Sequence, residues 1–166
     1  MGACFETISK TDLRRLARIA GEEREDFFAR RPDWRLLYQR RLLCTALTGR
    51  AAMHFCNGTR GFDQFDICLF FAAHAEAAFP HTWVSVRDFG ASRFGRAHAD
   101  KAYSGRRVRI SGRSLQCRPS DDPVAAVQTY LRRARTPTAR QLRDEAVVLI
   151  GPEHNLGYVA WPTLLA

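Results

Sequence analysis

Apolar positions near the start of the chain recur at the spacing of an α-helix. The stretch Ser9–Asp12 (SKTD) has the composition of a capping box, which satisfies the first free N–H groups of a helix. Leu13, Leu16 and Ala20 then fall on one face, so we expect a helix to begin at about residue 9. We expect Gly21 to break or bend this helix.

Residues 22–30 have the composition of a second short helical piece, whose acidic residues form a solvated face. Pro32 and Asp33 suit the first turn of a longer helix, because proline needs no N–H bond there. The apolar stripe of this third helix runs to about Leu47 and includes Trp34, Leu37, Tyr38 and Leu42. We expect these N-terminal helices to serve as packing elements.

The middle of the chain has the pattern of strands separated by turns. Residues 51–55 fit either a helix or a strand, and Asn57-Gly58 is typical of a turn. Phe65 to Phe71 form a near-continuous apolar run, as expected of a strand that is buried on both faces. Further strands are expected at residues 82–87 and 107–111.

The last third of the chain is expected to be helical and then extended. Ser120 to Pro123 (SDDP) is a good helix start, and Thr138 is expected to cap a short helix over residues 139–144. Residues 146–150 have the pattern of a buried strand, and residues 157–161 that of a final short strand.

The length and composition favour one domain. A chain of 166 residues with 46% hydrophobic residues suits a single core. We expect an α+β fold over residues 1–166, with a mixed central sheet and helices at both ends of the chain. The expected parts are N-terminal helices at about 9–47, a sheet-containing core at about 48–118, and a C-terminal helix and strands at about 120–161. Without a run of eighteen apolar residues, no membrane span is expected, and the default location is the cytoplasm.

The charge points to a polyanionic partner. The net charge is +9, and Lys10 and Lys101 are the two lysines among 26 basic residues. Arginine pairs with phosphate through two parallel hydrogen bonds and stacks on bases. Residues 87–118 hold nine basic residues against Asp88 and Asp100. The expected partner is a nucleotide or a nucleic acid, with an acidic protein as an alternative.

The segment from Gly49 to Ile67 carries the most informative motif. Gly49-Arg50 is followed by thirteen residues and then by Gln64-Phe65-Asp66-Ile67 at the start of the apolar strand. This spacing resembles the signature of the nucleotidyltransferase superfamily. There, a Gly-Gly or Gly-Ser turn precedes a strand with two alternating carboxylates that hold Mg²⁺. Here Arg50 replaces the second glycine and Gln64 the first carboxylate, so the chain resembles a degenerate bacterial domain of this type.

The resemblance implies a fold and a set of site residues. It implies a nucleotidyltransferase-like sheet, and a third carboxylate on the strand 107–111, where Arg109 stands. Asp88 is a candidate substitute, because Val84, Val86 and Asp88 alternate along one face of their strand. If the chain is catalytic, Asp66 and Asp88 would hold one Mg²⁺. The expected substrate or phosphate ligands are Gly49, Arg50, Gln64, Arg93, Arg96, Arg107 and Arg109.

Two basic segments are candidates for contacts with nucleic acid. In residues 88–96, Phe89 and Phe94 are interleaved with arginines and glycines, and the two rings are expected to stack on bases. The alternative is a surface loop whose phenylalanines pack into the core. In residues 107–111, Arg109 is expected to face solvent and Val108 the core, which suits either a phosphate-binding row or a solvated strand face.

The five cysteines form no C-x-x-C pair, which favours reduced thiols. His54, Cys56, Cys68 and His74 could bind zinc if their strands are adjacent, although free cysteine more often packs as a small hydrophobe.

The leading hypothesis is a nucleotidyltransferase-like domain, catalytically degenerate, that binds a nucleotide or nucleic acid through arginines. A non-catalytic nucleic-acid-binding module and a basic subunit of a protein complex remain as alternatives. The sequence leaves open whether the chain is an enzyme.

Overall fold

The computed structural model describes residues 6–58, 61–90 and 107–163. In this part of the chain, the α-helices are α1 (Lys10–Arg30), α2 (Pro32–Tyr38), α3 (Gly49–Cys56), α4 (Pro123–Arg133) and α5 (Pro137–Arg143), with a 3₁₀ turn at Glu153–Asn155. The strands are β1 (Leu42–Thr48), β2 (Phe65–Ala72), β3 (Val84–Asp88), β4 (Arg107–Leu115), β5 (Val147–Gly151) and β6 (Val159–Trp161). No described helix combines the length and the apolar character that crossing a membrane needs.

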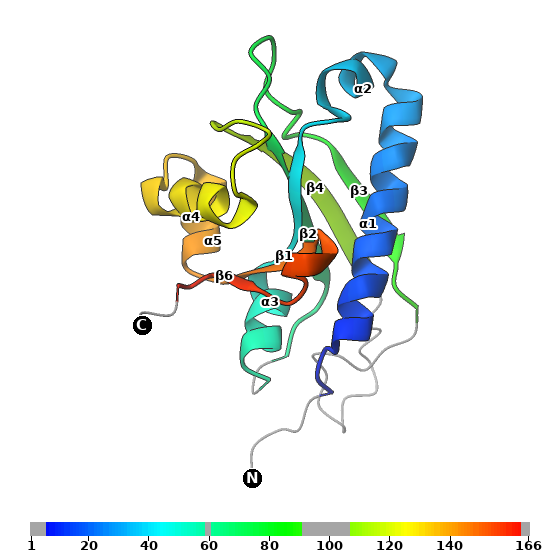
Figure 1. Cartoon of the computed structure of the whole chain (residues 1–166). Coiled ribbons are helices and arrows are strands. Elements are labelled where there is room, and N and C mark those ends of the chain that lie inside the picture. The colour runs from blue at the N-terminus through cyan, green and yellow to red at the C-terminus, as the bar shows by residue number, and fades with distance from the viewer. Residues whose placement is uncertain (1–5, 59–60, 91–106, 164–166) are drawn as a thin grey trace.

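The strands form one mixed sheet of six in the order β3-β4-β2-β1-β5-β6. β2 and β4 run parallel, and the other neighbouring pairs run antiparallel. Helix α1 lies on one face of the sheet, and the α4–α5 pair lies on the other (Figure 1). The prediction of an α+β domain with a mixed sheet is confirmed.

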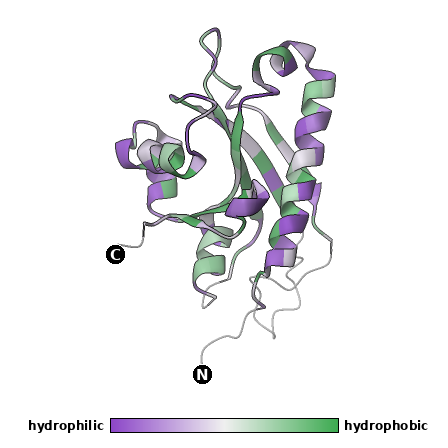
Figure 2. Ribbon diagram, in the orientation of Figure 1, coloured by the Kyte–Doolittle hydropathy of each residue, from purple (hydrophilic) through white to green (hydrophobic). Residues whose placement is uncertain are grey.

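Each face of the sheet has its own apolar core, because alternate side chains of a strand point to opposite sides. Leu13, Leu16 and Phe28 of α1 pack with Phe65 and Ile67 of β2 in the larger core. The smaller core joins α4 and α5 to the other side of the strands, through residues such as Val127, Leu131, Leu142, Cys68 and Phe70. In Figure 2, the hydrophobic strands lie between helices that are hydrophilic on their outer sides.

The α4–α5 pair leaves part of its face of the sheet uncovered. On β3, Val84 and Val86 keep 42% and 49% of their surface exposed. Beside them on β4, Arg107 and Arg109 are exposed, whereas Val108 and Ile110 are fully buried on the opposite face. The expected alternation in this strand is confirmed. The open region of the sheet is where the candidate site lies.

Two helix predictions near the N-terminus are wrong. Gly21 neither breaks nor ends α1, which runs unbroken because both halves bury apolar residues against the same sheet. The helix that begins at Pro32 ends at Tyr38, and residues 42–48 form the central strand β1 instead. β1 is buried on both faces between β2 and β5, and a short apolar run of this kind does not distinguish strand from helix by its periodicity.

The local signals elsewhere were more reliable. The capping box at Ser9 and Asp12 is present, with both of its hydrogen bonds. Residues 51–55 lie in a helix, α3, which settles the alternative left open by the sequence. α5 is capped by Thr136 rather than by Thr138, because Pro137 takes the first helical position.

A buried ion network fastens the edge strand β3 to α1. Glu23 is 5% exposed, and its carboxylate accepts hydrogen bonds from the Ser85 hydroxyl and from Arg87 Nη1, the latter at 2.8 Å. Arg30 lies 3.5 Å from the same carboxylate. Burial pushes the pKa of Glu23 up, but the hydrogen bonds from Ser85 and Arg87, with the charges of Arg87 and Arg30, bring it below its ordinary value.

Replacing Glu23 with glutamine is expected to lower the free energy of unfolding at pH 7 by about 1–3 kcal/mol, because Arg87 loses a charged partner. Since the pKa of Glu23 is lowered on folding, its contribution is present above the unfolded-state pKa and is lost as the pH falls below it. Urea unfolding of Glu23→Gln and of the exposed control Glu25→Gln at pH 7 and pH 3 tests this. Equal stability of the two variants at pH 7 would contradict it.

Two glycines are expected to respond oppositely to alanine. Nothing lies within 4 Å of a Cβ built on Gly21, so Gly21→Ala is expected to stabilise the protein by about 0.5–1 kcal/mol through helix propensity. A Cβ on Gly112 would lie 2.3 Å from the buried ring of Phe79, which stacks on Phe71, so Gly112→Ala is expected to cost about 1–3 kcal/mol. Denaturant midpoints of the two variants measure both effects.

Candidate functional site

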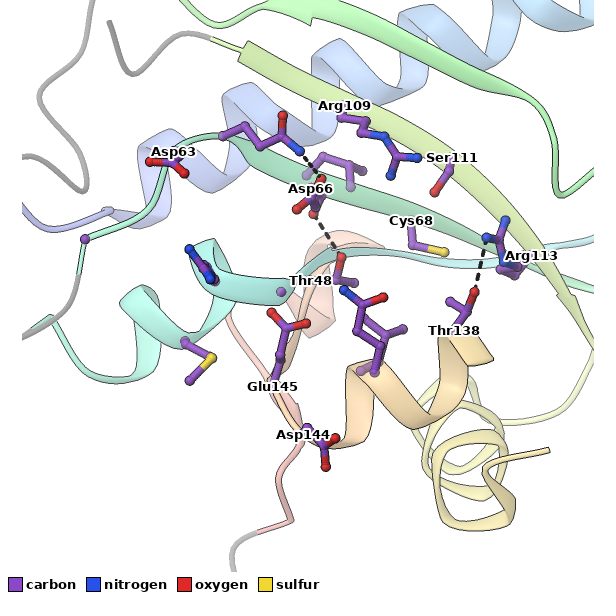
Figure 3. A pocket seen from close by; sticks show the side chains of 18 residues that line it. Thr48, Asp63, Asp66, Cys68, Arg109, Ser111, Arg113, Thr138, Asp144 and Glu145 are labelled. Atoms are coloured by element: carbon purple, nitrogen blue, oxygen red, sulfur yellow. Dashed lines mark hydrogen bonds between the residues drawn. The ribbon is translucent and has the colours of Figure 1, made fainter. Parts of the chain in front are cut away.

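A polar cleft of about 1130 Å³ opens on the uncovered part of the sheet, between the strands and α5 (Figure 3). Four separate parts of the chain line it: the β1–α3 junction, the start of β2, the outer side of β4, and α5 with the turn before β5. Its lining residues are Thr48, Gly49, Arg50, Met53, Gly61, Asp63, Gln64, Asp66, Ile67, Cys68, Arg109, Ser111, Arg113, Thr138, Gln141, Leu142, Asp144 and Glu145.

Gly49 stands at the junction where β1 ends and α3 begins. Its φ is +69°, in the left-handed region that favours glycine. A Cβ at this position would lie 3.3 Å from Oε2 of Glu145 and 3.4 Å from Oδ2 of Asp66. The backbone N–H of Gly49 also donates to the carbonyl of Ala146 at 3.2 Å. The glycine therefore permits the turn and lets two carboxylates approach the backbone.

Asp66 lies at the centre of the cleft, on the second residue of β2. Thr48 of β1 is its partner on one side and Arg109 of β4 on the other. Gln64 Nε2 donates a hydrogen bond of 3.0 Å to Oδ1 of Asp66, and the Thr48 hydroxyl donates to its backbone carbonyl at 3.2 Å. The carboxylate is thus held in place, and Oδ2 faces Gly49.

Burial raises the pKa of Asp66, and the negative charge of Glu145 raises it further. The charge of Arg109, the hydrogen bond from Gln64 and the charge of Arg107 act in the opposite direction without cancelling the rise. A carboxyl group with a raised pKa next to a second carboxylate favours a bound cation, which would relieve the repulsion.

The β4 side of the cleft carries arginines. Arg113 is fixed in the wall, because its guanidinium donates to the carbonyls of Gly112 and His81 and to the Thr138 hydroxyl, at 2.8, 3.2 and 3.3 Å. Arg109 is more exposed and forms no ion pair with a described carboxylate at salt-bridge distance. Figure 3 shows Arg109, Ser111 and Arg113 in a row along β4.

The charges in the cleft are mixed in sign. Four carboxylates, from Asp63, Asp66, Asp144 and Glu145, share it with Arg50, Arg109 and Arg113. In Figure 3, Asp66 and Glu145 lie around the β1–α3 junction, whereas Arg109 and Arg113 extend from β4. The arrangement suits a ligand that brings both negative groups and a cation.

Several of the residues singled out from the sequence meet in this cleft. Gly49, Arg50, Gln64, Asp66 and Arg109 all line it. They converge because β1, β2 and β4 are neighbours in the sheet and place these side chains at one end of it.

Other predicted site residues lie elsewhere. Asp88 does not line the cleft; it ends β3, and its Oδ1 accepts the N–H of Gly90 at 3.0 Å. Arg107 does not line it either, although its charge reaches Asp66. Phe89 is 3% exposed and packs against Phe65, so the structure places its ring in the core rather than against a base. Arg93, Phe94 and Arg96 lie outside the described residues.

In the described part of the chain, no group of three or more His, Cys, Asp or Glu side chains is placed to hold a metal such as zinc. His54 and Cys56 lie on the helix α3 rather than on a strand. His54 is buried, with Nε2 at 2.8 Å from the carbonyl of Glu6. Burial raises the pKa of the Cys68 thiol to about 12, which keeps it protonated at neutral pH.

Glu145 is the site residue that the sequence reasoning missed. It follows α5 and precedes β5, far along the chain from the Gly49 motif. The available signal was the acidic pair Asp144-Glu145 directly before a buried strand, since polar residues at strand ends often form sites. Glu145, rather than Asp88, lies beside Asp66 in the cleft.

No protein-family model, no curated protein and no solved structure matches this chain. The resemblance to nucleotidyltransferases therefore stays with the motif from Gly49 to Asp66, and function has to be inferred from the cleft.

Asp66→Asn is expected to raise the melting temperature at pH 7. Because folding raises the pKa of Asp66, its ionisation costs stability as the pH rises above the unfolded-state value. The amide keeps an oxygen that accepts from Gln64 but carries no buried charge. The gain should vanish below about pH 3.9, where the carboxyl group is protonated in both states. Thermal unfolding across this pH range, with the exposed Asp63→Asn as control, measures it; a loss of stability at pH 7 would contradict the buried-charge account.

Proposed function

We propose that this chain is a nucleotidyltransferase-like domain that binds a nucleotide, as its magnesium complex, in the cleft, and that its catalytic apparatus is degenerate. The observation that carries the proposal is the meeting of two carboxylates, Asp66 and Glu145, at a glycine turn, with arginines of β4 beside them. A cation and phosphate groups need these two kinds of side chain next to each other.

The order of elements around the turn supports the assignment. β1 ends at Gly49, α3 follows at once, and β2 returns antiparallel to β1 with Asp66 as its second residue. This is the arrangement that the spacing of the motif implies for a nucleotidyltransferase-like domain. Without a Cβ, the turn leaves the backbone open to close approach by a ligand.

The residues present fit a magnesium ion that is held largely through its nucleotide. Mg²⁺ takes oxygen ligands and is commonly bound by one or two carboxylates together with substrate phosphates. Asp66 and Glu145 supply two carboxylates whose oxygens lie within 3.4 Å of one point beside Gly49. When bound, the ion would neutralise phosphate charge. Asp88 has no place in this set, because it lies outside the cleft.

Arginines on the other side of the cleft would hold the phosphates. Arg109 extends its exposed guanidinium beside Asp66, and Arg50 is exposed at the start of α3. Arg113 is already engaged with the protein and would act mainly through its charge. The cleft is large enough for a nucleotide, since ligand sites typically span about 300–1,000 Å³.

The same residues argue for binding over transfer. Two-metal phosphoryl chemistry needs carboxylates on both sides of the reacting phosphate. Gln64 is neutral, and its amide already donates a hydrogen bond to Asp66. Arg109 is the β4 neighbour of Asp66, at the position where a third carboxylate would be expected. A guanidinium there repels a second cation.

Calorimetric titration with ATP, GTP, CTP and UTP is expected to show binding that requires Mg²⁺. Asp66→Asn and Glu145→Gln should each weaken it about tenfold to a hundredfold, as should Arg109→Gln, because each removes a charge-assisted contact. The controls Glu25→Gln and Arg18→Gln also remove one negative and one positive charge, but on α1, across the sheet from the cleft. They should leave the nucleotide affinity unchanged.

Binding that is indifferent to Mg²⁺ and to all three cleft variants would overturn the proposal. Incorporation of labelled nucleotide into an acceptor, abolished by Asp66→Asn, would show an active transferase instead of a degenerate one.

A further inference from the structure

A second basic surface lies on the C-terminal helix pair, away from the arginines of the cleft. Five arginines occur in the twelve residues 132–143, which contain no acidic residue. All five are exposed, and we call them the C-terminal arginine surface: Arg132, Arg133, Arg135, Arg140 and Arg143.

Packing does not account for these side chains. The inward faces of α4 and α5 are apolar and bury Val127, Leu131, Ala139 and Leu142. Figure 2 colours the part of this helix pair farthest from the sheet as hydrophilic. Since the arginines lie on the exposed part of the pair, they can be replaced without opening the core.

Neutralisation by the protein does not account for them either. Seven ion pairs are formed at salt-bridge distance among the described residues, and none includes a member of this surface. Arg14, Arg24, Arg30, Arg31 and Arg87 have carboxylate partners, whereas other described arginines such as Arg18 and Arg40 form no ion pair either. The C-terminal surface differs from those in holding five such arginines within twelve residues. Five guanidinium groups within twelve residues, none of them in an ion pair, repel one another, and an external polyanion would remove that repulsion.

A shallow pocket adjoins the C-terminal arginine surface. Arg133 and Arg135 border a depression of about 370 Å³ between the end of β4 and α4, together with Thr129 and Tyr130. Asp121 and Asp122 are on its rim and keep their negative charge, but neither is at salt-bridge distance from a described arginine. Arg133 and Arg135 thus border the pocket without a direct carboxylate partner among the described residues.

We propose that the C-terminal arginine surface binds the phosphate backbone of a nucleic acid. The charge is spread over a helix, a turn and a second helix, which suits a repeating row of phosphates better than one compact anion. All the cations are arginine, whose planar fork pairs with phosphate through two hydrogen bonds. α5 also lines the cleft through Thr138 and Gln141, so this surface and the cleft share a helix. The surface stands independently of what the cleft holds.

The test measures the affinity of the full chain for fluorescein-labelled single-stranded RNA and DNA by anisotropy, from about 50 to about 200 mM salt. The variant Arg132→Gln/Arg133→Gln/Arg135→Gln is compared with Arg18→Gln/Arg35→Gln/Arg40→Gln, which loses the same charge from exposed positions on α1, within α2 and after α2. The first triple should flatten the slope of log affinity against log salt by about 2, since each phosphate contact on a single strand contributes about 0.7. The control should keep the slope. Thermal melts confirm that both variants fold.

Three results would overturn the proposal: equal loss of affinity in both triples, which indicates net charge alone; no binding to either oligonucleotide; and a polyglutamate peptide that binds as tightly as RNA, which indicates an acidic protein partner. Preference between RNA and DNA identifies the nucleic acid. Nucleotide titration separates this surface from the cleft. The first triple should keep the nucleotide affinity, and Asp66→Asn should keep the affinity for oligonucleotides.

Discussion

The left-handed turn at Gly49 ties together the parts of the chain that build the cleft. It ends β1 and starts α3 without an intervening loop, so that β2 returns beside β1 with Asp66 next to the turn. Its N–H bonds to Ala146 and thereby fixes the start of β5, which brings Glu145 against the same glycine. A single residue without a side chain therefore lies against two carboxylates, Asp66 and Glu145, that are far apart in the sequence. A β-carbon here would press on both and force the backbone into a disfavoured region.

The second determinant is the incomplete cover of one sheet face. α4 and α5 cover only part of their face of the sheet. On the uncovered part, the exposed side of β4 carries arginines, whereas a strand covered by another helix would carry apolar residues there. The protein offers a rigid strand, rather than a loop, as the support for its exposed cations. Charged side chains on a strand keep a fixed spacing, which suits recognition of a ligand with fixed geometry. On the opposite face, Glu23 of α1 accepts a hydrogen bond from Arg87 of the edge strand β3. This contact holds β3 in place although no described helix covers its other face.

The sequence predicted what depends on neighbouring residues and failed where distant contacts decide. Ser9 and Asp12 satisfy each other locally, and the apolar run from Phe65 to Phe71 has few alternatives to a buried strand. Leu42 to Thr48 is equally apolar, and its place between two other strands made it a strand. Asp88 was placed on the correct face by alternation, but β4 lies between β3 and β2, about 10 Å of sheet that periodicity does not reveal. Glu145 was missed for the same reason.

The topology of the sheet also bears on when the cleft forms during folding. Its walls come from residues near 49, 66, 109 and 145, and the walls at 66 and 109 meet through the parallel pairing of β2 with β4, which residues 73–106 connect. Such long-range parallel pairing is slow compared with hairpin formation, because the loop must close before contacts reward it. We therefore expect the cleft to form late in folding. A ligand for the cleft would act late, trapping molecules that have completed the sheet and giving no help to those still assembling it.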